Sequence, residues 1–123
     1  MNAPDNRFTF PKSVRLSSSN DYGRVFKKPL KSKDKCFTLL VTTNNTDVSR
    51  LGLAISKKAV NKAVDRNRVK RLVRDSFRHS RHALAGIDIV VLANRGLGDR
   101  SNKEMLTSLS NHWKQLVKKC APS

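Results

Sequence analysis

The chain has 123 residues, of which 37% are hydrophobic, which suits a single domain with one core spanning residues 1–123. Lysine and arginine number 26 against 9 acidic residues, and a net charge of +17 destabilises a compact protein unless a polyanion such as nucleic acid is its usual partner. No apolar run approaches the roughly 18 residues of a membrane-spanning helix and no signal-like start is present, so we expect a cytoplasmic protein without a membrane partner.

The first part of the chain predicts extended residues followed by a short helix. Residues 1–12 contain two prolines and no periodicity, so they are expected to be extended and mobile. From Ser17 onward, serine and asparagine residues that can cap a helix precede Tyr22, Val25 and Phe26 at helical spacing. This first helix should end before Pro29.

Two strands are predicted next, at residues 36–43 and 49–56. Each alternates between an apolar face and a face of small or weakly polar residues. We expect the two strands to be neighbours with matching apolar faces. The apolar faces contain Phe37, Leu39 and Val41 in the first strand and Leu51, Leu53 and Ile55 in the second. The opposite faces contain Thr38, Leu40 and Thr42 in the first and Gly52, Ala54 and Ser56 in the second, and the small residues of the second leave backbone accessible as the floor of a cleft.

Residues 65–78, "DRNRVKRLVRDSFR", predict an amphipathic helix with a cationic side. At about 100° per residue, one arc is apolar and faces the core, and a separate arc on roughly the opposite side is basic. An ordinary solvated face would intersperse acidic residues at i+4, and here only Asp75 lies nearby. We therefore interpret the basic arc as a nucleic-acid-binding surface. The core arc contains Val69, Leu72, Val73, Ser76 and Phe77; the basic arc contains Lys70, Arg71, Arg74, Arg78 and Arg81, with Asn67 among them.

The last elements are a buried strand and an amphipathic helix. Residues 86–94, "GIDIVVLAN", form a nearly continuous β-branched run, typical of a strand covered on both faces. The final helix should begin near Ser101 or Asn102. The order helix, strand, strand, helix, strand, helix, with room for a short early strand, predicts an α+β two-layer sandwich. The residues expected to point inward from the final helix are Met105, Leu106, Leu109, Trp113, Leu116 and Val117.

No motif for catalysis or metal binding is evident in the sequence. The Gly96-Leu97-Gly98 stretch lacks the third glycine and the βαβ context of a dinucleotide site, and favours a turn. His79 and His82 lack further ligands for zinc, and the acidic residues are too scattered for two-metal chemistry. Two isolated cysteines predict inert thiols rather than a disulfide.

Residues 50–78, "RLGLAISKKAVNKAVDRNRVKRLVRDSFR", resemble the signature of the bacterial ribonuclease P protein subunit, whose hallmark is an Arg-Asn-Arg helix. "FPKSVRL", the pair Tyr22 and Phe26, and "DIVVLANRG" before a last helix resemble the same family in the same order. The resemblance covers nearly the whole chain. It implies a mixed sheet of about four strands with three helices and a left-handed βαβ crossover.

The resemblance also implies a division of labour between protein and RNA. The partners would be the catalytic RNA of ribonuclease P and precursor tRNA, whose 5′ leader the holoenzyme removes with Mg²⁺. Catalysis would reside in the RNA, so no catalytic residue, bound cofactor, protein-held metal or protein partner is expected here. The implied contacts to the catalytic RNA are Lys57, Lys58, Arg66, Asn67, Arg68, Lys70, Arg71, Arg74 and Arg78. The implied leader-binding residues are Tyr22, Phe26, Thr38, Leu40, Gly52, Ala54, Ser56 and Lys58.

Two other classes of protein fit parts of the sequence. A ribosomal or general structural RNA-binding protein would share the charge, the size and the basic helix. A DNA-binding domain could use residues 65–81 as a recognition helix, although no short companion helix precedes it at the required spacing. The ordered combination of aromatic helix, small-residue sheet face and Arg-Asn-Arg run favours ribonuclease P.

Overall fold

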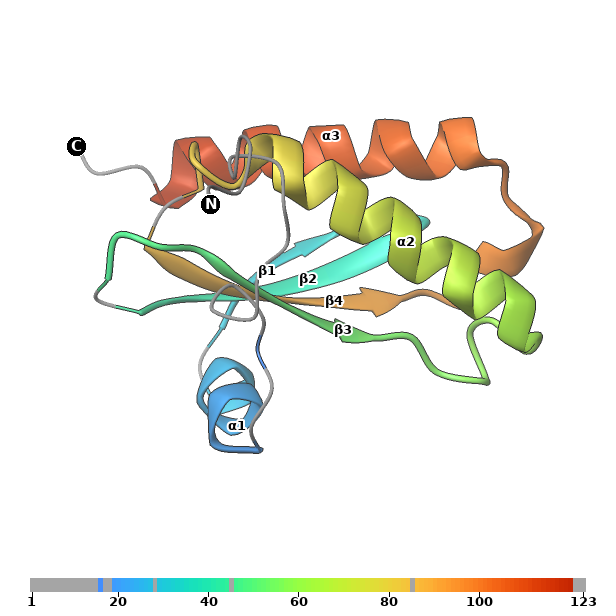
Figure 1. The fold of residues 1–123 in the computed structure, drawn as a ribbon, viewed down its shortest axis with the longest axis horizontal. Coiled ribbons are helices and arrows are strands. Elements are labelled where there is room, and N and C mark those ends of the chain that lie inside the picture. Colours follow the sequence, from blue (N-terminus) through green and yellow to red (C-terminus); the bar gives the residue numbers. More distant parts are fainter. Residues whose placement is uncertain (1–15, 17–18, 28, 45, 85, 121–123) are drawn as a thin grey trace, which may run out of the picture.

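The computed structural model describes residues 16, 19–27, 29–44, 46–84 and 86–120, and these form a mixed four-stranded sheet with three α-helices. The helices α2 and α3 lie on one face of the sheet and α1 lies on the other (Figure 1). The α+β class and the predicted element order are confirmed. The elements are α1 (Ser19–Lys27), β1 (Leu30–Lys33), β2 (Phe37–Thr43), β3 (Arg50–Ala54), α2 (Ala63–Ser80), β4 (Ile87–Ala93), a 3₁₀ turn (Leu97–Asp99) and α3 (Asn102–Cys120).

The sheet order β1-β2-β4-β3 corrects one prediction, because β2 and β3 are not neighbours. Strand β4 lies between them, antiparallel to β2 and parallel to β3. The β-branched run of β4 is the segment best suited to a central position, since its residues from Ile87 to Val91 are all buried. The connection from β3 to β4 is therefore a parallel crossover through α2.

The face of the sheet under α2 and α3 carries the main core. Alternating residues of β2, β3 and β4 point to this face, as their spacing predicts. Helix α2 adds Val69, Val73 and Phe77, each fully buried, and full burial of such a side chain stabilises the fold by about 1.5–3 kcal/mol. The residues facing this core from the strands include Phe37, Leu39, Val41, Leu51, Ile87, Ile89 and Val91.

The contact between α2 and α3 centres on Trp113. Its ring packs edge-to-face on Phe77, with centroids 6.0 Å apart. The indole Nε1–H donates a hydrogen bond of 2.7 Å to the Ser76 hydroxyl, so the polar group of this buried residue is satisfied. The predicted inward position of Ser76 is thereby explained.

Helix α3 starts where the sequence predicts, but one of the residues predicted to face the core points outward instead. A reciprocal capping box at Ser101 and Glu104 fixes its start, because the Glu104 amide donates to the Ser101 hydroxyl and the Ser101 amide donates to the Glu104 carboxylate. Met105, Leu109, Trp113 and Leu116 face the core, and Val117 packs against it. Leu106 is 43% exposed, so its predicted inward position is wrong. The buried stripe of α3 instead includes the polar residues Ser108 and His112.

The remaining predictions on the fold concern short segments. Strand β1 is the short early strand that the sequence allowed. Gly96 has φ +86°, the left-handed region that favours glycine, and it precedes the 3₁₀ turn at Leu97–Asp99, which confirms the predicted turn. The predicted extended segment 1–12 lies outside the described residues. None of the helices in the described part of the chain is long and apolar enough to cross a membrane.

Candidate functional site

Helix α1 and the sheet face beneath it form the cleft that the small-residue pattern predicts. Leu40 of β2 and Val90 of β4 are buried there against Val25 and Leu16. Tyr22, Ala54 and Leu92 pack against this cluster and remain partly exposed. The cleft therefore has an apolar base under α1 and an accessible rim beside it.

Tyr22 is fixed to the edge strand β3 by two contacts. Its hydroxyl oxygen accepts a hydrogen bond of 3.2 Å from the Leu53 amide. Its ring lies over Gly52, where a Cβ would meet the Tyr22 hydroxyl at 2.7 Å. Only glycine permits this approach without displacement of the ring. The predicted proximity of Tyr22 and Gly52 in one cleft is thus present in the structure.

The other predicted leader-binding residues lie at different depths of the same face. Phe26 on α1 is 47% exposed, while Leu40 is buried beneath the helix. Thr38 is half-buried and donates a hydrogen bond of 2.8 Å to the Asn94 side chain. Ser56 is exposed just beyond the end of β3. Of the predicted set, Phe26, Ser56 and Lys58 are exposed, Tyr22, Thr38 and Ala54 are partly exposed, and Leu40 and Gly52 are buried.

Two hollows adjoin along β3 and connect the cleft to the basic helix. A hollow of about 160 Å³ is lined by residues that include Tyr22, Gly52, Lys70 and Arg74. A second, of about 480 Å³, is lined by residues that include Ala54, Ser56, Leu92 and again Lys70. Lys70 lies at the boundary between the predicted leader cleft and the predicted RNA-binding face.

The basic residues of α2 divide into an exposed group and a group with internal partners. Arg71, Arg74 and Asn67 are exposed, and Lys70 is half-buried. The Arg78 guanidinium pairs with Asp75 one turn before it. The exposed group retains its hydrogen-bond donors for an external ligand, and phosphate is the ligand that an unbalanced cationic face attracts.

The two arginines of the Arg-Asn-Arg run also contact neighbouring loops. The Arg66 guanidinium donates hydrogen bonds of 3.0 Å to the carbonyl oxygens of Val60 and Asn61. The Arg68 guanidinium donates to the Asn102 side chain and to the Gly98 carbonyl. These contacts orient the first turn of α2, a role that the sequence pattern did not indicate. Lys57 and Lys58, before this turn, are both exposed.

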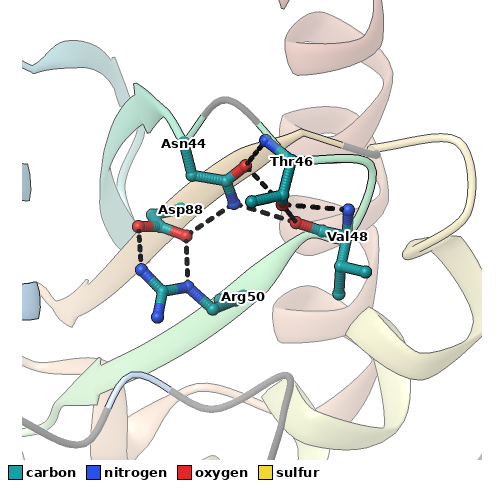
Figure 2. A network of polar contacts seen from close by, with 5 residues as sticks. All are labelled: Asn44, Thr46, Val48, Arg50 and Asp88. Carbon is teal, nitrogen blue, oxygen red and sulfur yellow. Dashed lines mark hydrogen bonds and ion pairs between the residues drawn. The ribbon is translucent and has the colours of Figure 1, made fainter.

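A buried polar network at the opposite end of β3 was also missed by the sequence analysis (Figure 2). Asp88 is fully buried and accepts two hydrogen bonds from the Arg50 guanidinium, at 2.9 and 2.7 Å. The Asn44 side-chain amide donates a third, at 2.8 Å. The same amide group donates to the Val48 carbonyl and so holds the connection between β2 and β3. This network joins the connection between β2 and β3 to β4, which is about 40 residues away in sequence.

A second polar cluster joins α3 to the turn between β1 and β2. Burial raises the pKa of the Asp34 carboxyl, but hydrogen bonds from Ser108 and from the backbone amides of Phe37 and Cys36 outweigh it and leave the pKa below its ordinary value. Burial, with the nearby Asp34 charge, raises the pKa of the Cys36 thiol. A protonated, buried thiol is a weak nucleophile, which matches the predicted inert cysteine.

No group of three or more histidine, cysteine, aspartate and glutamate side chains that could hold a metal ion occurs in the described ranges of the chain. His79 is in the last turn of α2 and His82 follows the end of that helix, and both are exposed. His112 is buried against Ser32. The geometry instead combines an aromatic cleft with a cationic helix. These features define a basic α+β protein that binds RNA.

Comparison with known proteins identifies the family. The ribonuclease P family model matches residues 10–117. The ribonuclease P protein component of Thioalkalivibrio sulfidiphilus is 46% identical over 91% of this chain and 93% of its own length, and that of Pseudoalteromonas translucida is 39% identical over 94% and 82%. The chain belongs to the ribonuclease P protein family.

Solved structures of the same family share the fold. The ribonuclease P protein of Staphylococcus aureus superposes with a TM-score of 0.77 at 30% identity, covering 85% of this chain and 95% of that one. The Thermotoga maritima protein gives 0.73 at 31% identity, covering 82% and 96%. The protein is thus a component of an endoribonuclease holoenzyme of tRNA processing, and the alternatives of a ribosomal or DNA-binding protein are not supported.

Proposed function

We propose that this chain binds the catalytic RNA of ribonuclease P through the exposed basic face of α2, and binds the 5′ leader of precursor tRNA in the cleft between α1 and the sheet. It thereby assists endonucleolytic removal of the leader, in the cytoplasm. The observation that carries this proposal is the position of Lys70, which lines both hollows along β3. One continuous surface can therefore contact the catalytic RNA and its substrate at once.

The chemistry of each part of the surface suits its proposed ligand. Lysine and arginine contacts to phosphate give strong affinity for RNA of any sequence. Aromatic rings such as Tyr22 and Phe26 can stack on single-stranded bases of any identity, which suits leaders whose sequences vary. The absence of a side chain at Gly52 lets the Tyr22 ring lie close against β3, and Ala54 carries no bulky side chain to obstruct a base beside that ring.

Catalysis on this proposal belongs to the RNA subunit. Mg²⁺ would be held there as well. The residues of this chain position the substrate: Tyr22 on its β3 support receives a base, and Lys70 at the boundary of the two surfaces holds a phosphate beside it. Their effect is on affinity and alignment.

The proposal is tested by adding the purified chain to ribonuclease P RNA and precursor tRNA at low Mg²⁺ and near-physiological salt. Cleavage should rise well above that of the RNA alone. The variant Arg71→Gln should give less stimulation, while Lys114→Gln, an equal charge change on the exposed side of α3, should behave as the unmodified chain. No stimulation by the unmodified chain would contradict the proposal.

A further inference from the structure

Helix α1 crosses the strands of the sheet rather than running along one of them. Its Tyr22 is bonded to Leu53 on the edge strand β3. Its Val25, nearly one turn later, packs on Leu40 and Val90 of the two central strands. The helix ends at Lys27, and β1, the opposite edge strand, begins at Leu30. The cleft beside α1 therefore extends across the whole sheet, from β3 to β1.

The side chains of β1 alternate between the two faces of the sheet, and two lysines point to the α1 side. Ser32 is buried on the α3 side, where its hydroxyl lies 2.6 Å from His112 Nδ1. Lys31 and Lys33 are thus on the α1 side. The antiparallel register pairs Lys31 with Leu40 and Lys33 with Thr38, and both partners belong to the cleft face.

These two lysines differ in their surroundings from Asp34, whose carboxylate is engaged by Ser108 and by the backbone amides of Cys36 and Phe37. Both lysines are exposed, and neither forms an ion pair with any residue in the described part of the chain. They stand three strand spacings from β3, a distance of about 14 Å at about 4.8 Å per spacing. Lys70 occupies the β3 end of the cleft. The α1 side of the sheet is therefore cationic at both edges, with small and apolar residues between.

We propose that Lys31 and Lys33 bind backbone phosphates of the distal part of the leader, after its proximal nucleotides have passed Tyr22 and Phe26. This inference rests on the proposed function, because it requires the leader to lie in the cleft. A single strand that enters at β3, next to α2, and follows α1 across the sheet leaves it over β1. Contacts with phosphate alone are independent of sequence, so leader length rather than leader identity determines whether the site is used.

The expected effect follows from counterion release. Each phosphate contact on a single strand releases about 0.7 of a counterion, which corresponds to about fourfold in affinity at 0.15 M salt. The double variant Lys31→Gln, Lys33→Gln should therefore bind long-leader precursor about fifteenfold more weakly in the holoenzyme. A precursor whose leader ends within the cleft should bind unchanged, as should mature tRNA.

The experiment measures holoenzyme affinity for long-leader precursor, short-leader precursor and mature tRNA across a salt series. The matched control is Lys114→Gln, Lys118→Gln, which removes two exposed charges from α3 on the other side of the sheet. Thermal unfolding of each variant confirms that the fold is intact. An equal loss for all three RNAs, or no loss for the long leader, overturns the inference.

A parallel Tyr22→Ala variant separates this inference from the proposed function. If Tyr22→Ala weakens binding of both precursors while the β1 double variant changes nothing, the leader occupies the cleft and does not reach β1. If neither variant affects any precursor, the leader is bound elsewhere and the proposed cleft itself is wrong.

Discussion

Replacement of Arg50 by methionine should strongly destabilise the fold without touching either proposed RNA surface. The substitution removes the guanidinium charge and two of the hydrogen bonds of Asp88, a carboxylate with no solvent exposure. Removing one partner of a buried ion pair typically costs 3–5 kcal/mol. Because the Arg50 side chain is 25% exposed, water can enter the vacated space, and we expect the lower end, about 3 kcal/mol.

The loss converts into a measurable shift of the unfolding midpoint. An unfolding entropy of about 2.1 cal/mol/K per residue gives about 0.26 kcal/mol/K for 123 residues. A loss of about 3 kcal/mol then lowers Tm by about 12 °C. Differential scanning calorimetry or circular dichroism measures it directly, with urea unfolding as an independent check on the free energy.

The double variant Arg50→Met, Asp88→Asn provides the control. A neutral amide at position 88 can still accept the hydrogen bond from Asn44 and leaves no buried charge unpaired. The double variant should therefore lose at least about 1 kcal/mol less unfolding free energy than the two single variants lose in sum. A single-variant loss below about 1 kcal/mol, or strict additivity, would refute the view that Arg50 stabilises a buried charge.

Four further predictions follow from the structure. Tyr22→Ala should lower holoenzyme affinity for precursor tRNA by about 1–3 kcal/mol and leave the affinity for mature tRNA unchanged. Tyr22→Phe keeps the ring and should have a much smaller effect. Equal losses of affinity for both RNAs would argue against leader binding in the cleft. Arg71→Gln should reduce the slope of log affinity for the catalytic RNA against log salt by about 0.7–0.9, and an unchanged slope would show that Arg71 makes no phosphate contact. The pKa of the Asp34 carboxyl lies below its ordinary 3.8 in the folded protein. Its contribution to stability is therefore present above pH 3.8 and is lost as the pH falls through the folded-state pKa. When unfolding is measured across an acid pH series, Asp34→Asn should show a smaller loss of stability below about pH 4 than the unmodified chain. Sulfate should raise Tm relative to chloride at equal ionic strength, because an anion bound at Lys70, Arg71 and Arg74 relieves their repulsion, and an unchanged midpoint would contradict this.

Local periodicity predicted the helices and the faces of the strands because each is determined by residues close in sequence. The stripe of Val69, Val73 and Phe77 faces the core as its spacing requires, and Gly52 and Ala54 lie on the cleft side. The neighbours of each strand were not predictable in this way. Alternation in β2 and β3 is equally consistent with direct pairing, and only the folded chain shows that β4 separates them.

The candidate site was predicted in composition but not in detail. A resemblance to the family indicated Arg66 and Arg68, yet their bonds to loop carbonyls depend on turns whose conformation the sequence does not specify. Asp88 interrupts an apolar run, and nothing in its local pattern identifies Arg50, 38 residues away, as its partner. Lys31 and Lys33 were missed because β1 has only four residues, too few for an alternating pattern that would show which side chains face which side of the sheet.

Strand β3 is the element on which both proposed surfaces depend. One end is held by the Arg50–Asp88 pair, its middle supports Tyr22 through Leu53, and the loop after it is tied to α2 by Arg66. A displacement of β3 would move the cleft and the basic helix together. An Arg50 variant, measured close to its lowered Tm, should therefore weaken binding of the catalytic RNA and of precursor tRNA in parallel. Changes at Tyr22 and Arg71 affect one ligand each, because they alter a surface and leave the strand beneath it in place.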